Sequence, residues 1–245
     1  MSFSKGLVIP GQKHTSQDGF KENSKMRIGF QKQLEGLERD LLRMSSMVEE
    51  AIVKSVRSLA QQDLPLAQEV IEGDKPIDDL ELNLRERCMQ LLALQQPVAR
   101  DLRKISTIFK VATDLERIAD QATNIAELTV SIGHAPLIKP LIDIPKMAKI
   151  ARGMLHKAIE AFVREDEQLA RDVCSQDEEV DLLYASLFDE LVGFLGGSHD
   201  GREAKQIVQL MFTARSLERI ADHATNIAEQ VVYMLTGHVV KLNGF

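Results

Sequence analysis

The sequence from Leu115 to Glu127 reads LERIADQATNIAE, and the sequence from Leu217 to Glu229 reads LERIADHATNIAE. Twelve of the thirteen positions are identical at an offset of 102 residues, and the one difference places His223 where the first copy has Gln121. A shared helical pattern would repeat hydrophobic character but not residue identity, so these two signature segments record an internal duplication. We therefore expect the chain to perform one task in two related places.

Apolar residues recur at helical spacing on both sides of each signature segment, and no stretch has the alternation of a strand. The pattern predicts an all-α protein made of two tandem, pseudo-symmetric three-helix bundles. We expect residues 1–30 to be a flexible tail, 31–135 the first bundle and 136–245 the second. The predicted helices span 31–63, 66–72, 76–94 and 97–132 in the first half, and 144–166, 175–195 and 201–235 in the second.

The amino-acid composition argues against several classes of protein function. Apolar residues make up 44% of the chain and aromatic residues only 4%, a balance that suits helices packed through aliphatic side chains. A net charge of -7 gives no electrostatic footprint for nucleic acid. Cys88 and Cys174 are isolated, which indicates ordinary thiols in a reducing compartment. No apolar run approaches the roughly 18 to 20 residues that cross a bilayer, so we expect a cytoplasmic protein, at most peripheral to a membrane.

Each half contains two acidic pairs with four-residue spacing. On a helix this spacing places the two Cβ atoms roughly 5 to 6 Å apart on one face, where like charges repel. If adjacent antiparallel helices bring two pairs together, four carboxylates converge, and such oxygen ligands suit Mg, Mn or Fe. The pairs in the signature segments are Glu116/Asp120 and Glu218/Asp222, and the pairs outside them are Asp74/Asp78 and Asp177/Asp181.

Simpler interpretations of the same residues remain open. Acidic pairs are common on solvated helix faces. Near predicted helix starts, acids also cap helices and complement the helix dipole, and this applies to Asp74, Asp78, Asp177 and Asp181. Arg117 and Arg219 can neutralise neighbouring acids. Asn124 and Asn226 can serve either as hydrogen-bonding residues within the bundle or as outer ligands.

The sequence gives little support for catalysis. Di-iron bundles use Glu-x-x-His motifs, whereas Ala119 and Ala221 stand three residues after the signature glutamates. His223 has no counterpart in the first half, and the remaining histidines form no cluster. There is no phosphate-binding loop and no nucleophile with a base near it in the sequence. We therefore expect no enzyme; the alternatives kept are a ferritin-like metalloenzyme and a helical scaffold without a signalling role.

The two signature segments, together with QQPVARDLRKI before the first, closely resemble the twin signatures of the PhoU family of phosphate-uptake regulators. The resemblance extends from about Met26 to Leu235. It implies an all-α, usually dimeric protein that binds metal on its acidic faces. Carried over to this sequence, it makes Glu116, Asp120, Glu218 and Asp222 metal ligands, with Asp74, Asp78, Asp177 and Asp181 as further contributors, for an ion such as Fe, Mn, Mg or Zn.

The resemblance also implies a function. Proteins of this family couple the phosphate ABC transporter, through its ATPase subunit, to a membrane sensor histidine kinase, and they hold the phosphate-starvation response off when phosphate is plentiful. Two departures are the N-terminal extension, within which Met26 is an alternative translation start, and the second-half turn GGSHDGREA in place of QQPVARDLR. The sequence does not locate the dimer interface or the partner-binding surfaces, and it leaves open whether metal signals or stabilises.

Overall fold

A computed structural model of the chain describes residues 16–197 and 200–241, with side chains from residue 27 onward. These residues form seven helices and no strand, which confirms the all-α prediction. The helices are α1 (Ser16–Gln61), α2 (Leu64–Gln95), α3 (Ala99–Ile132), α4 (Asp143–Arg164), α5 (Glu167–Cys174), α6 (Asp177–Gly197) and α7 (Gly201–Thr236).

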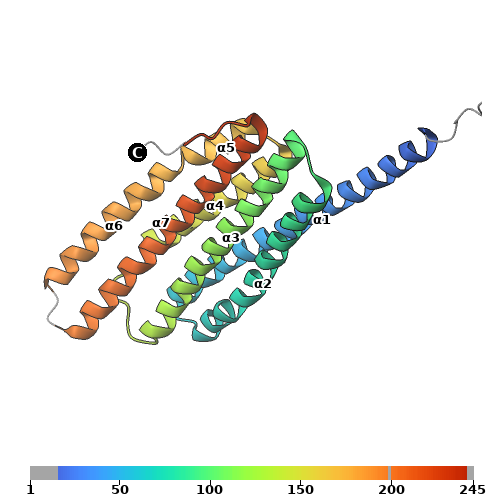
Figure 1. Ribbon diagram of the computed structural model, residues 1–245. Coiled ribbons are helices and arrows are strands. Elements are labelled where there is room, and N and C mark those ends of the chain that lie inside the picture. The colour runs from blue at the N-terminus through green and yellow to red at the C-terminus, as the bar shows by residue number, and fades with distance from the viewer. Residues whose placement is uncertain (1–15, 198–199, 242–245) are drawn as a thin grey trace, which may run out of the picture.

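The helices form two bundles that meet along α3 and α7. The first bundle is α1, α2 and α3, and the second is α4, α7 and the pair α5 and α6, which together take the place of α2. Figure 1 shows α3 and α7 side by side, with α2 and α6 at the two edges. The two central helices run antiparallel, since Arg103 Nε donates to the carbonyl of Met234 at 3.0 Å and Thr107 Oγ1 to that of Gln230 at 3.3 Å. The predicted two-repeat architecture is confirmed.

Small residues in α3 allow close helix packing. Ala112, Ala119 and Ala126 recur every seven residues and are completely buried. Ala126 packs with Ala67 and Val70 of α2 in a small apolar cluster of its own. A larger side chain at such a position would force neighbouring helices apart, because protein interiors are close-packed.

One predicted break is wrong. The sequence Gly73-Asp-Lys-Pro76 is not a stop followed by a start, because α2 continues through it with Pro76 inside the helix. A proline removes one backbone hydrogen bond and crowds the preceding turn. Buried residues lie on both sides of it, among them Val70 and Ile77, so packing along the whole length of α2 holds the helix together. The corresponding break in the second half is real and separates α5 from α6.

The start of the first helix also differs from the prediction. The helix predicted to begin near residue 31 begins at Ser16, so residues 16–30, assigned to a flexible tail, are helical. Figure 1 shows this end of α1 projecting beyond the bundles. Residues 27–29 are exposed, so apolar periodicity could not reveal the extension. The rest of the predicted tail, residues 1–15, lies outside the described residues.

We expect Ala126→Leu to lower the free energy of unfolding by about 1 to 3 kcal/mol, because the added atoms overpack the contact with Ala67 and Val70. Urea denaturation at fixed pH measures the change. Val130→Leu is the matched control on the same helix, since Val130 is 43% exposed, and it should change stability by less than about 0.5 kcal/mol. Equal stability of the two variants would contradict the packing assigned to α3.

Candidate functional site: two acidic clusters

The first acidic cluster consists of Asp74 and Asp78 of α2 with Glu116 and Asp120 of α3. Their carboxylates are close enough to repel one another: Asp120 raises the pKa values of Asp74, Asp78 and Glu116, after a larger contribution from burial in each case. The structure therefore brings the two predicted acidic pairs of the first half together, as adjacent antiparallel helices should.

The second acidic cluster consists of Asp181 of α6 with Glu218 and Asp222 of α7. Burial, followed by the charges of Asp222 and Asp181, raises the pKa of Glu218 to about 7, and burial with the charge of Asp222 raises that of Asp181. Asp177 is buried at the first residue of α6, where its charge and that of Glu229 add to the effect of burial and raise the pKa of Cys174 to about 12.

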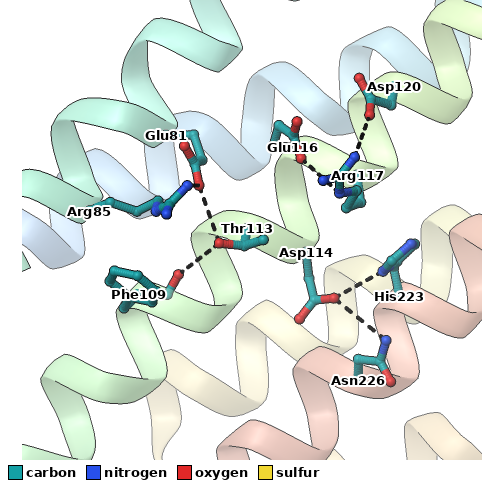
Figure 2. Close-up of polar contacts among 10 residues, drawn as sticks. All are labelled: Glu81, Arg85, Phe109, Thr113, Asp114, Glu116, Arg117, Asp120, His223 and Asn226. Carbon is teal, nitrogen blue, oxygen red and sulfur yellow. Dashed lines mark hydrogen bonds and ion pairs between the residues drawn. The ribbon is translucent and has the colours of Figure 1, made fainter.

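Arginines partly neutralise both clusters. In Figure 2, Arg117 lies between Glu116 and Asp120 and pairs with each at 3.3 Å. These two ion pairs confirm the prediction that Arg117 neutralises neighbouring acids. In the second cluster the ion pair is made instead by Arg215 with Glu218, and Arg219 only lowers the pKa of that glutamate through its charge.

Some carboxylate oxygens still lack a partner. Asp74 Oδ1 and Glu218 Oε2 are buried and accept no hydrogen bond, although the Asp74 carboxyl group as a whole has a hydrogen bond with Thr123 that lowers its pKa. Buried acceptors of this kind are costly unless a cation or donor satisfies them, and the all-oxygen donor set fits a hard divalent cation. Within the described residues, however, no three Asp, Glu, His or Cys side chains are already grouped to hold a metal ion. The eight predicted ligands thus remain a prediction.

Glu81 was missed by the sequence analysis. It is 7% exposed and faces the first cluster from α2, where it pairs with Arg85 at 3.2 Å and accepts a hydrogen bond from Thr113 at 3.2 Å (Figure 2). The sequence places Glu81 on the same helix face as the apolar residues Ile77 and Leu84, and this unusual position of an acid could have marked it as part of the site. Glu127 was also missed as a contributor: it lies on the acidic stripe of the first signature segment, and its charge raises the pKa of Asp74.

The two clusters differ at equivalent positions. Where the first half has Glu81 and Thr113, the second has Tyr184 and Arg215, whose guanidinium lies 5.9 Å from the tyrosine ring centre. An acid and a hydroxyl are thereby replaced by an aromatic ring and a cation. The first cluster is consequently the more negative of the two.

The single difference between the signature segments also has a structural reason. His223 Nδ1 lies 2.9 Å from Asp114 Oδ1, across the contact between α3 and α7 (Figure 2). Asn226 donates to the same carboxylate oxygen at 3.5 Å, so its role is hydrogen bonding within the fold. The first-half equivalent of His223 is Gln121, and the second-half equivalent of Asp114 is Ser216, so the acid and the histidine occur together only once.

The fold and the site define a duplicated helical protein with an acidic cluster between two helices of each repeat. A model of the PhoU domain matches the chain twice, over residues 41–129 and 144–231. The chain belongs to the PhoU family.

Named relatives cover nearly the same length. The phosphate-specific transport system accessory protein PhoU homolog of Aquifex aeolicus is 41% identical over 210 residues, which is 86% of this chain and 94% of the relative. The homolog of Clostridium acetobutylicum is 37% identical, over 87% and 97% of the two chains. The crystal structure of PhoU from Pseudomonas aeruginosa is similar with a TM-score of 0.81 and 36% identity, covering 85% of this chain and 100% of that one.

The phosphate transport system regulatory protein PhoU from Streptococcus pneumoniae is similar in structure as well, with a TM-score of 0.79 and 29% identity over 86% of this chain and 99% of that one. In none of the helices between residues 16 and 241 is there a stretch long and apolar enough to cross a membrane.

We expect the stability of the metal-free protein to fall as pH rises from about 4.5 to 7. The pKa of Glu218 rises from 4.5 to about 7 on folding, so in this window the folded state holds a proton that the unfolded state has released. Glu218→Gln should flatten the profile and raise the free energy of unfolding at pH 8 by about 2 to 3 kcal/mol.

Urea denaturation in EDTA at several pH values measures this effect. Glu160→Gln is the matched control, because Glu160 is 41% exposed and lies outside both clusters. A profile that keeps its slope in Glu218→Gln would contradict the burial of this carboxyl group.

Proposed function

We propose that this protein is a negative regulator of the phosphate-starvation response and a modulator of phosphate uptake. In this proposal it acts as a cytoplasmic adaptor, peripheral to the membrane, between the ATPase subunit of the phosphate ABC transporter and a sensor histidine kinase. The observation that carries the proposal is the twofold match to the PhoU domain, supported by accessory proteins of phosphate-specific transport that align over almost their whole length. Homodimerisation is part of the proposal.

We further propose that each repeat binds a divalent metal ion. The first acidic cluster would hold one site, and the second cluster with Asp177 the other. The unpartnered oxygens of Asp74 and Glu218 support this, as do the burial and, after it, the mutual repulsion that raise the pKa values of the clustered acids. A bound cation supplies positive charge that offsets this repulsion. Arg117 and Arg215 would turn away from the carboxylates that they now neutralise.

A regulator acts by binding one state of its partner better than another. A ligand shifts an equilibrium only by its difference in affinity for the two states. The charge of each acidic face changes when a cation binds, so metal occupancy would alter how well that face fits a charged partner. Relatives are named accessory and regulatory proteins, which favours this class over a ferritin-like oxidase.

Deleting the gene should switch on a phosphate-starvation reporter in phosphate-rich medium, and restoring the gene should silence it. The reason is that the adaptor is expected to hold the kinase in its repressing state while transport proceeds. Reporter output per cell is the measurement, with an empty vector as control. A reporter that stays off in the deletion strain would count against the proposed regulator.

Substituting the acids of one repeat at a time should remove one metal site at a time. Glu116→Gln with Asp120→Asn is expected to remove the site of the first repeat, and Glu218→Gln with Asp222→Asn that of the second, because each pair supplies the central carboxylates. Isothermal titration with Mn²⁺ and metal analysis of the purified protein measure the loss.

Asp189→Asn with Glu160→Gln is the matched control, since both acids are outside the clusters. Unchanged binding by the combined cluster variant would refute the assignment of ligands. Rapid oxygen consumption on adding Fe²⁺ would favour the ferritin-like alternative instead.

A further inference from the structure

A groove runs between α1 and α4 on the side away from the central helices. Its volume is about 340 Å³, and none of its lining residues belongs to α3 or α7. The floor is apolar: Ile52, Val56 and Ala148 are nearly buried, whereas Val53 is 43% exposed. The complete lining is Ile52, Val53, Val56, Arg57, Ala60, Pro145, Ala148, Lys149 and Arg152.

Both walls of the groove carry positive charge. Arg57 stands on the α1 wall, and Lys149 and Arg152 stand on the α4 wall, all three exposed to solvent. No ion pair joins any of them to an acid among residues 27–197 and 200–241, and Arg57 Nε donates a hydrogen bond to Gln61 Oε1 at 3.3 Å. The helix α4 carries five Lys or Arg and two acids, in a chain whose net charge is -7. The groove is therefore a local cationic site on an acidic protein.

The duplication provides an internal comparison for this charge. The α1 and α4 helices align at an offset of 103 residues, at which Asp63 and Asp166 cap the following helices in the same way. At the symmetry-related end of the α1 and α4 pair, acids or a serine replace the three cations. The equivalents of Arg57, Lys149 and Arg152 are Glu160, Ser46 and Glu49. The three cations of the groove walls therefore occur at only one end of the α1 and α4 pair and do not follow from the duplication of the fold.

We propose that this groove is the docking site for an acidic amphipathic helix of another protein. A valley between two packed helices accepts the ridge of a third, and an apolar stripe with i, i+3/i+4, i+7 spacing would cover the exposed floor. Because cations stand on both walls of the groove, they favour a partner helix with acids on both sides of its apolar stripe. The lining spans about two turns of each helix, so the contact is short and suits a reversible partner.

Two other occupants fit the observations less well. A membrane surface is flat on this scale, whereas the cations here flank a groove. A second copy of this chain would have to present an acidic helix, and α6 is acidic with Leu182 and Phe188 exposed, so self-association is treated as an outcome of the test. The inference goes beyond the proposed function, since it assigns a second surface that involves neither acidic cluster.

The test uses a fluorescein-labelled helical peptide of about 14 residues, with leucines on one stripe and glutamates on both flanks. Fluorescence anisotropy with the full chain in EDTA should show saturable binding that weakens as salt increases. Reversing the charges together, by Arg57→Glu, Lys149→Glu and Arg152→Glu, should weaken binding by at least about tenfold. Val53→Asp, on the exposed floor, should weaken it without removing any cation.

Controls separate this site from general charge attraction. Ser46→Glu adds a negative charge at the symmetry-equivalent end and should leave binding unchanged. The same peptide with lysines in place of glutamates should not bind, and thermal melting confirms that each variant is folded. The proposal is overturned if the acidic peptide fails to bind, or binds the charge-reversed variant equally well.

The remaining outcomes identify a different occupant. Binding to phosphatidylglycerol vesicles without binding to the peptide would assign the groove to lipid and overturn the helix proposal. Self-association of the chain that is abolished by the charge reversal, with no displacement by the peptide, would assign it to a second copy. None of these outcomes depends on metal or on the phosphate reporter, so failure here leaves the proposed function standing.

Discussion

The antiparallel contact between α3 and α7 fixes where everything else in the molecule lies. Each of these helices carries one signature segment and meets several neighbours at once. The apolar arc packs into its own bundle, another face meets the other central helix, and the acidic stripe faces α2 or α6. The acids therefore lie between α2 and α3 in the first repeat and between α6 and α7 in the second. The identity of the buried positions in the two segments follows from this crowding, because few side chains fit among all the neighbours.

The burial and mutual repulsion of the clustered acids lower the stability of the fold at neutral pH. Carboxylates that repel one another and are partly removed from water raise one another's pKa values, and nothing in helix packing requires them. The fold tolerates the repulsion by supplying arginines from the same helices as the glutamates, three residues before Glu218 and one after Glu116. A cation that replaced those arginines would gain a site already shaped by the backbone.

The sequence was sufficient for the fold and for the pairing of acids across helices. Helical periodicity located every long helix, and duplication implied that the halves match. It failed where stability depends on tertiary packing, as at Pro76, and where the helix carries exposed residues, as at residues 27–29 of α1. In the site, Glu81 was missed because one acid in an apolar stripe carries no spacing signal. The pairing of Asp114 with His223 joins residues 109 apart, a contact that no local pattern encodes.

The pairing of Asp114 with His223 has a consequence for the whole molecule. Two identical repeats about a twofold axis would look the same after half a turn, so nothing approaching the protein could tell one end from the other. Here the histidine and its acid occur once, one cluster faces Glu81 and the other Arg215, and only one end of the α1 and α4 pair is cationic. The copies keep one framework but have diverged in charge. Gene duplication has thereby produced a molecule whose two ends present different charges, so that a neighbour approaching one end meets a surface unlike the one at the other end.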